Sequence, residues 1–325
     1  MAEITASGQK RLVVVTGRAH PQLALDVAKE LGTELVHTDA RTFASSEIYA
    51  RFDESVRGCD AFVIQSHTRP VNEWLMEQLI MIDALKRASA KRITVVAPYY
   101  PYARQDKKGR GREPISARLV ADLFKAAGAD RIMSVDLHAA QIQGFFDGPV
   151  DHLFAMPVLL KHFQERLDPS TLTVVSPDMG RVRVADVWSD KLGAPLAIIH
   201  KRRDPFVANK VSVHEIVGEV AGRICLIVDD IIDTGSTIVK AAEALKNAGA
   251  IGVIVAATHA VFSDPASEIL QSDFIDSVVV TDTLPIPEDR RFATLTILPI
   301  APLIASAIHE VFSDGSVTSM FDGAA

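Results

Sequence analysis

Three aspartates and a turn of hydroxyl residues follow a short apolar stretch at 224–228. In order these residues are Asp229, Asp230, Asp233, Thr234, Gly235, Ser236 and Thr237. Ionised carboxylates only accept hydrogen bonds, so Asp229 and Asp230 suit the hydroxyls of a sugar or a metal ion. A turn of small residues that leads into a helix offers hydroxyls and backbone N–H groups to a phosphate. The set predicts a site for a ribose 5-phosphate.

An ordinary strand-to-helix turn is the alternative interpretation. Asp233 or Thr234 would then cap the following helix, and the other acids would be solvated. We favour the binding site because the acids and the turn occur together. The stretch also closely resembles the phosphoribosyl pyrophosphate loop of type I phosphoribosyltransferases. That resemblance implies that the acids bind ribose hydroxyls and that the turn binds the 5-phosphate.

Two acids and a histidine follow other apolar stretches. Asp136 and His138 come after 132–135, and Asp178 comes after 172–175. A capping role is the simpler explanation for both acids, and a lone histidine is more often structural than a ligand. For Asp178 a ligand role is equally well supported, because ligands bind at the carboxyl ends of parallel strands.

Two cationic loops could contact a nucleotide. The loop 98–112 holds three of the four tyrosines of the chain together with several Arg and Lys residues. Its rings could pack on a base and its arginines on phosphates, although a solvated loop is the alternative. The loop 200–204 reads His-Lys-Arg-Arg-Asp, and its cations could act on a polyphosphate rather than only favour solubility.

These residues depend on an α/β framework, because short apolar stretches alternate with amphipathic segments along the chain. Strands are expected at 12–16, 61–65, 93–97, 132–135, 172–175, 196–199, 224–228, 252–256, 277–280 and 295–298. Helices are expected at 21–31, 72–90, 115–127, 180–192, 238–248, 265–270 and 302–311. The loops before 204 and after 228 should leave the same edge of one sheet.

A chain of 325 residues is long for one domain, so two domains are expected. Gly148, Pro149 and Pro157 interrupt the pattern and indicate a domain boundary near 150–157. We therefore expect an N-terminal domain at 1–153 and a C-terminal domain at 154–325. The C-terminal segment could pack back on the first domain. Cys59 and Cys225 lie beside or within apolar stretches and are expected to be buried free thiols.

The composition indicates a soluble globular protein, with 48% hydrophobic and 23% charged residues. A net charge of -7 argues against a general affinity for nucleic acid. No apolar run approaches the ~18 residues of a membrane span, so no membrane partner is expected. The apolar core near the N-terminus is too short for a signal peptide, and we therefore expect a cytoplasmic location.

The motifs in their order resemble the class I ribose-phosphate pyrophosphokinases over nearly the whole chain. The matching stretches are 43–58, 99–106, 136–146, 176–178, 201–203 and 229–237. The resemblance implies two phosphoribosyltransferase-like domains, each a mostly parallel sheet flanked by helices, in a homohexamer. It also implies that ATP and ribose 5-phosphate, with Mg2+, give phosphoribosyl pyrophosphate and AMP for nucleotide biosynthesis.

The same resemblance assigns roles to individual residues. Those of the ATP site are Phe43, Ser45, Ser46, Glu47, Arg104 and Gln105. Those of the ribose 5-phosphate site are Arg203, Asp229, Asp230, Asp233, Thr234, Gly235, Ser236 and Thr237. Lys201 and Arg203 are the catalytic cations, and His138 and Asp178 are the Mg2+ positions. Ser45 and Ser46 depart from the usual Asp-Gly pair, so one carboxylate contact to the nucleotide is missing.

Other functions share parts of this pattern. A phosphoribosyltransferase would explain 229–237 but not the second α/β half or the loops at 104–106 and 201–203. The acidic composition and the lack of a recognisable helix-turn-helix extension argue against a transcription regulator of the same fold. The presence of Lys201, Arg203, Asp178 and Asp229 argues against a non-catalytic synthase subunit. Inorganic phosphate and ADP are expected as allosteric effectors, through polar residues that could equally be ordinary surface. These residues are Ser55, Arg57, Lys107, Arg110, Ser316, Thr318 and Ser319.

Overall fold

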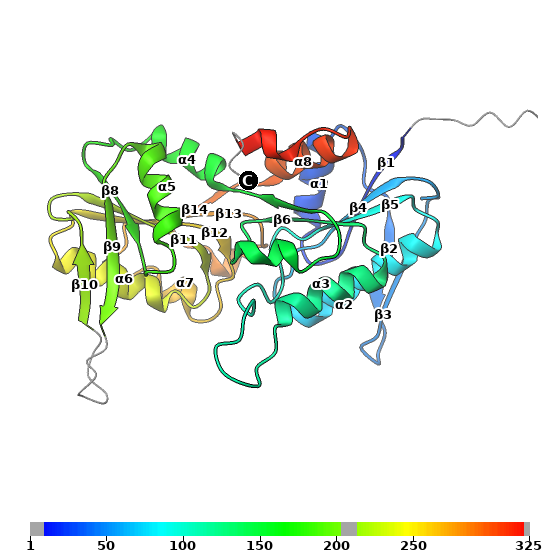
Figure 1. Ribbon diagram of the computed structural model, residues 1–325, viewed down its shortest axis with the longest axis horizontal. Coiled ribbons are helices and arrows are strands. Elements are labelled where there is room, and N and C mark those ends of the chain that lie inside the picture. The colour runs from blue at the N-terminus through cyan, green and yellow to red at the C-terminus, as the bar shows by residue number, and fades with distance from the viewer. Residues whose placement is uncertain (1–9, 203–212, 322–325) are drawn as a thin grey trace, which may run out of the picture. The chain divides into compact units, whose positions relative to one another are not determined.

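The chain forms two compact units in the structure, a computed structural model that describes residues 10–202 and 213–321. For residues 201, 202, 213 and 214 only the backbone is described. The first unit comprises the residues up to Leu153 together with those from Ala301 onward, and the second is Phe154–Ile300. Each unit has its own sheet, and each sheet has helices on both faces (Figure 1).

The first unit contains a five-stranded parallel sheet. Its strands, in sheet order, are β1 (Leu12–Thr16), β4 (Asp60–Ile64), β5 (Arg92–Val96), β6 (Arg131–Val135) and β7 (Val150–Leu153). One face carries α1 (Pro21–Glu30) and α8 (Ala301–Phe312), and the other carries α2 (Val71–Arg87) and α3 (Ser116–Ala127) (Figure 1). Outside the sheet, β2 (Thr38–Thr42) and β3 (Ile48–Phe52) form an antiparallel ribbon against α2. Two 3-10 turns, η1 (Ala140–Gly144) and η3 (Val317–Phe321), complete the unit.

Helix α3 shows why these segments fold as they do. Val120, Ala121 and Phe124 recur at helical spacing and are buried against the sheet. On the opposite side Arg118 and Asp122 lie one turn apart and form an ion pair at 3.0 Å. Apolar residues therefore decide which face of the helix packs on the core.

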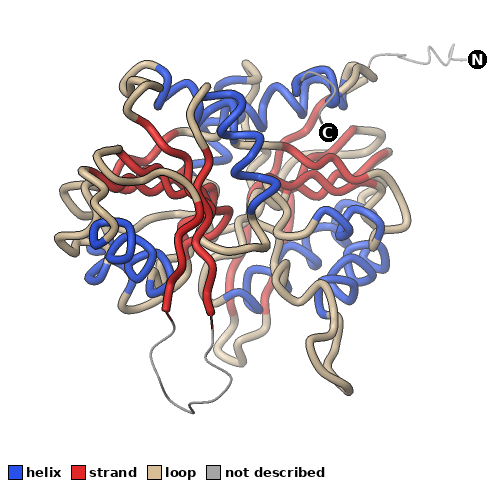
Figure 2. The backbone as a smooth tube through the Cα atoms, turned by 60° about the vertical axis from the view of Figure 1, so that its left-hand side comes forward, coloured by secondary structure: helices blue, strands red, loops and turns tan. Residues whose placement is uncertain are grey.

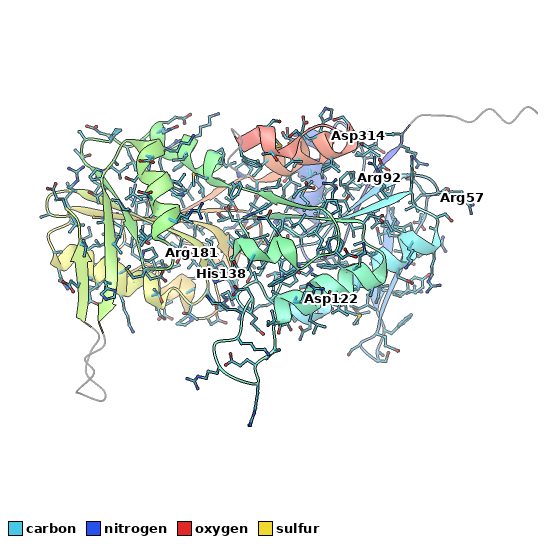
Figure 3. The ribbon with its side chains drawn as sticks, viewed as in Figure 1. Arg57, Arg92, Asp122, His138, Arg181 and Asp314 are labelled. Atoms are coloured by element: carbon cyan, nitrogen blue, oxygen red, sulfur yellow. The ribbon has the colours of Figure 1, made fainter. Side chains whose placement is uncertain are left out.

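The C-terminal segment belongs to the first unit. Helix α8 packs on α1, and Asp314, just beyond α8, accepts a hydrogen bond from Arg92 of β5 at 3.2 Å (Figure 3). Lys10 also forms an ion pair with Asp314. Arg92 in turn pairs with the buried Asp60, so these charges connect the segment to the sheet.

The second unit contains a seven-stranded sheet in which only β10 is antiparallel. In sheet order its strands are β10 (Val213–Val217), β9 (Leu196–Arg202), β8 (Leu172–Ser176), β11 (Ile224–Ile232), β12 (Gly252–Ala260), β13 (Ser277–Thr281) and β14 (Leu295–Leu298). The helices are α4 (Met156–Gln164), α5 (Val182–Leu192), α6 (Ser236–Asn247) and α7 (Ala266–Ile269), with a 3-10 turn η2 (Glu288–Arg290). Figure 2 shows the strands as a layer between these helices.

The expected α/β fold with mostly parallel sheets is confirmed, and every expected strand and helix is present. The strands β2, β3, β7 and β10, the helix α4 and the three 3-10 turns among the described residues were not predicted. The expected end of β11 at Val228 is wrong, because pairing with β12 continues to Ile232 opposite Ala260. Likewise β9 continues past residue 199 to Arg202, because the antiparallel β10 pairs with it. Cys59 and Cys225 are free and buried, as predicted. Within the described ranges, no helix is both long and apolar enough to span a bilayer.

Candidate active site

The acid-rich stretch lies at the carboxyl edge of the second sheet. In the register Ile227 of β11 lies opposite Val175 of β8, and Val175 lies opposite Ala197 of β9. All three strands are parallel, so the residues that follow these positions point toward one edge. Asp229 and Asp230 stand inside β11 rather than after it, with Asp229 opposite Ala257 of β12.

One cation that the sequence analysis did not single out contacts both acids. Arg181 directly precedes α5, and its Nε lies 3.4 Å from Oδ1 of Asp229 while its Nη2 contacts Oδ2 of Asp230. In Figure 3 Arg181 lies at the N-terminal end of α5. All three side chains are largely buried, at 15% exposed for Arg181, 18% for Asp229 and 10% for Asp230.

The two adjacent carboxylates do not share the cation equally. Burial, and then the charge of Asp230, raises the pKa of Asp229 to about 8, although the ion pair with Arg181 opposes the rise. Two like charges on neighbouring residues cannot both be fully compensated by one guanidinium. Near neutral pH the pair therefore holds a proton for much of the time.

The turn that follows is suited to an anion. Helix α6 begins at Ser236, and its N-cap is Gly235 with a φ of 74°, a conformation that glycine adopts without strain. The alternative in which Asp233 or Thr234 is the N-cap of α6 is wrong, because that position is Gly235, which has no side chain. The Thr234 hydroxyl instead donates to Ser236 Oγ at 3.3 Å. The first N–H groups of a helix have no partners within it, and a phosphate can accept from them.

Asp178 orders the loop between β8 and α5. Its Oδ1 accepts hydrogen bonds from the backbone N–H of Gly180 at 2.8 Å and of Arg181 at 3.2 Å. A side chain added at Gly180 would lie 3.2 Å from the same oxygen and would push the carboxylate away. Asp178 remains exposed, so its hydrogen bonds within the turn do not prevent contact with a ligand.

The cationic loop starts at the same edge. Lys201 lies on β9, the neighbour of β8, and its backbone is opposite residue 214 of β10. Arg203, predicted to act in catalysis and sugar binding, lies outside the described residues. The structure therefore brings the backbone at Lys201, the loop of Asp178 and the acids of β11 to adjacent strand ends.

In the first unit, Arg104 and Gln105 line a pocket of about 330 Å³. Its other lining residues are Pro70, Val71, Asn72, Tyr99, Tyr102 and Ala103. The Gln105 side chain accepts a hydrogen bond from Ser116 at 2.6 Å, which fixes its carbonyl. The idea that all three tyrosines clamp a base is wrong for Tyr100, because it is 2% exposed and its hydroxyl donates to the Ala117 carbonyl at 2.9 Å.

The other residues expected at the ATP site form the tip of the β2–β3 ribbon. Phe43 is 46% exposed, and the guanidinium of Arg41 lies over its ring at 5.7 Å. Ser45 donates to Oε2 of Glu47 at 2.7 Å, and Ser46 has a φ of 70°. None of the described residues 43–47 lines the pocket at Arg104.

His138 and Asp178 belong to different units. His138 is partly buried in the loop after β6. Within the described part of the chain, no group of three or more His, Cys, Asp or Glu side chains is placed to hold a metal ion. Mg2+ is commonly held by one or two carboxylates together with substrate phosphates, so the donors present fit that ion rather than a closed metal site.

Comparisons with known proteins match almost the whole chain. Residues 12–128 match the model of the N-terminal domain of ribose phosphate pyrophosphokinase, and residues 201–322 match that of the phosphoribosyl synthetase-associated domain. A ribose-phosphate pyrophosphokinase of Streptomyces avermitilis is 62% identical over 322 residues, which are 99% of each chain. The chain belongs to the ribose-phosphate pyrophosphokinase family.

Further relatives agree with this membership. The ribose-phosphate pyrophosphokinase of Mycobacterium tuberculosis is 60% identical over 324 residues, covering 99% of each chain. The crystal structure of phosphoribosylpyrophosphate synthetase from Mycobacterium smegmatis is 60% identical, with a TM-score of 0.90 over 94% of this chain and 100% of that one. The resemblance derived from the sequence motifs is thus confirmed.

Proposed function

We propose that this protein transfers the diphosphoryl group of ATP to the anomeric hydroxyl of ribose 5-phosphate. The products are phosphoribosyl pyrophosphate and AMP, which would serve nucleotide biosynthesis. One observation carries the proposal beyond family membership. The acids of β11, the phosphate-type turn before α6 and the start of the cationic loop at Lys201 lie at one edge of one sheet.

The sugar would be bound by two groups of residues. Asp229 and Asp230 would accept hydrogen bonds from the ribose hydroxyls, and Asp233 would extend this acidic side. The N–H groups and hydroxyls from Thr234 to Thr237 would hold the 5-phosphate at the start of α6. With both ends fixed, the anomeric oxygen would be positioned as the nucleophile.

In the reaction, the anomeric oxygen would form a bond to the β-phosphorus of ATP. The bond from that phosphorus to the oxygen bridging the α- and β-phosphates would break, and AMP would leave with the electron pair. The hydroxyl proton would pass to water. Lys201 and Arg203 would stabilise the negative charge that grows on the α- and β-phosphates, which is the main contribution expected of a protein in such transfers.

The nucleotide would be bound by residues of the first unit. Arg104 and Gln105 at the pocket would contact ATP, as would Phe43, Ser45, Ser46 and Glu47 of the ribbon. A guanidinium suits phosphates or the face of a base, and an exposed phenyl ring suits the face of a base. Because Ser45 replaces a carboxylate, its hydroxyl would act mainly by orienting Glu47, to which it donates.

Mg2+ is the metal that this chemistry requires, and His138 and Asp178 are its proposed protein contacts. When bound there, Mg2+ would supply positive charge that stabilises the phosphates of ATP during the transfer. Asp178 offers the hard oxygen that Mg2+ prefers, whereas His138 fits better through a water molecule or through the metal-bound nucleotide. A homohexamer in the cytoplasm with phosphate and ADP as effectors is proposed on the family resemblance alone.

The test is a product analysis. The protein would be incubated with ATP, Mg2+ and ribose 5-phosphate, and the nucleotides separated by ion-exchange chromatography. AMP that appears only with the sugar, in equal amount to phosphoribosyl pyrophosphate, is the expected result. ADP as the product would overturn the diphosphoryl transfer, and absence of turnover would favour a regulator or a non-catalytic subunit.

A further inference from the structure

The ion pairs around β11 contain a residue for which the proposed reaction has no role. Arg181 contacts Asp229 and Asp230 with two different nitrogens of one guanidinium. It is not part of the turn before α6, and it comes from the loop after a neighbouring strand. The two acids therefore have a fixed partner before any sugar binds.

The geometry limits where the carboxylates can turn. A guanidinium is planar, and its nitrogens donate in fixed directions, so contact through both Nε and Nη2 orients two acids at once. Oδ1 of Asp229 also accepts the backbone N–H of Asp230 at 2.9 Å. One oxygen of each acid is thus engaged on the protein side, and a carboxylate has several further acceptor positions for hydroxyl groups.

Arg181 is itself positioned by the loop of Asp178. Its backbone N–H donates to Oδ1 of Asp178 at 3.2 Å, and that oxygen also binds Gly180. The side chain is only 15% exposed, so water screens its charge less than at the surface. The same residue therefore connects the loop of Asp178 with the acids of β11.

We propose that Arg181 is a positioning residue for sugar binding: it holds Asp229 and Asp230 in the orientation in which they accept the ribose hydroxyls. The inference rests on the proposed function, because it assumes that these acids bind ribose 5-phosphate. Arg181 itself would not touch the sugar. Its loss should weaken sugar binding and leave ATP binding and the chemical step much less affected.

The experiment compares steady-state kinetics of the wild type with Arg181→Gln, Arg181→Lys and the control Arg183→Gln. Arg183 lies on the first turn of α5 and is exposed, which makes it a matched loss of one arginine. For Arg181→Gln we expect KM for ribose 5-phosphate to rise about tenfold or more, the effect of losing a charge-assisted hydrogen bond, with KM for ATP unchanged. Arg181→Lys should restore part of the affinity, because it keeps the charge but not the fork, and Arg183→Gln should match the wild type.

A double-mutant cycle tests whether Arg181 acts through the acids. In an Asp230→Asn background the further change Arg181→Gln should raise KM for ribose 5-phosphate much less than it does alone. Equal effects in both backgrounds would overturn the inference, as would an unchanged KM in Arg181→Gln. A lowered KM would also overturn it, since Arg181 would then compete with the sugar for the acids.

Two measurements keep these outcomes separate from other failures. If the wild type forms no AMP from ATP and ribose 5-phosphate, the proposed function fails and not the inference about Arg181. If Arg181→Gln does not fold, as judged by thermal unfolding, the neutral pair Arg181→Gln/Asp230→Asn is compared with Asp230→Asn alone. Titration calorimetry with ribose 5-phosphate in the absence of ATP should show the same order of affinities as the KM values.

Discussion

Each unit has an arginine that pairs with carboxylates beside the carboxyl end of a strand, but one arginine contacts a single acid and the other contacts two. In the first unit Arg18 follows β1 and pairs with Glu77 of α2, which is 0% exposed. Glu77 accepts hydrogen bonds from the Arg18 backbone N–H at 2.7 Å, from its Nε at 2.6 Å and from Gln65 at 3.0 Å. In the second unit Arg181 faces two acids.

The difference indicates which arginine serves the fold and which serves the site. One acid with three donors and one cation is a satisfied pair, and nothing is gained there by binding a ligand. In the second unit two neighbouring acids share the guanidinium of Arg181, and burial and the charge of Asp230 raise the pKa of Asp229. Such perturbed groups at the end of a sheet are typical of functional sites.

The largest expected effect concerns Lys201, which would add a second cation to the acid-rich edge. Lys201→Ala should lower kcat by about a hundredfold or more, which corresponds to about 2.7 kcal/mol of transition-state stabilisation. Affinity for both substrates should change little, because the contact would form mainly as charge develops. Turnover and calorimetric binding of each substrate check this. Unchanged turnover would remove Lys201 from the mechanism.

Breaking the ion pair between Arg18 and Glu77 should instead lower stability. Glu77→Ala removes the acid that forms an ion pair with Arg18. It also removes the carboxylate that accepts a hydrogen bond from the Gln65 side chain. We expect a loss of about 2–3 kcal/mol in the free energy of unfolding, less than for a fully buried pair because Arg18 is 33% exposed. Urea unfolding measures the loss. A variant as stable as the wild type would show that the pair contributes nothing to the fold.

The coupled pair Asp229 and Asp230 should affect the pH dependence of stability. The pKa of Asp229 is raised from 3.8 to about 8, so the folded protein holds a proton that the unfolded chain releases between these values. The contribution of neutral Asp229 is complete below about pH 4 and is lost as the pH rises through about 8. Relative to Asp229→Asn, the wild type should therefore become less stable as the pH rises from 5 to 8.5.

Denaturant unfolding of both proteins at several pH values checks this, because titrations at residues outside the pair Asp229–Asp230 cancel in the difference. Asp233→Asn, on the loop beyond β11, is the control for removal of an acid from the same region. A difference between the wild type and Asp229→Asn that stays constant from pH 5 to 8.5 would contradict the raised pKa.

The sequence predicted correctly those parts of the molecule in which a strand and the loop directly after it carry the whole residue pattern. The apolar stretch before Asp229 and the turn through Thr237 are contiguous, and both lie where the pattern places them. The parallel sheets follow from apolar strands that alternate with amphipathic helices. Helix α4 was missed because Pro157 looks like a break, yet proline is tolerated in the first turn of a helix, where it lies here.

The parts that were missed depend on neighbours in space. The role of Arg181 requires that β8 and β11 be adjacent in the sheet, which the sequence around Arg181 does not reveal. Strand β2 carries mostly polar residues, and β3, although mostly apolar, is only partly buried in a ribbon that stands apart from the sheets, so neither shows the pattern of a buried core strand. Tyr100 was assigned to the nucleotide because its chemistry fits a base, and only packing shows that it belongs to the core.

The smallest expected effect lies at the tip of that ribbon, at Ser46. Ser46 keeps a left-handed backbone with a φ of 70°, which strains a residue with a Cβ atom. Ser46→Gly should therefore raise the free energy of unfolding by up to about 1 kcal/mol. Ser45→Gly should lower it, because Ser45 does not adopt a left-handed backbone and its side chain donates a hydrogen bond to Glu47. Chemical denaturation of both variants measures the two signs. A loss of stability in Ser46→Gly would mean that the serine side chain, and not the backbone angle, decides the shape of this turn.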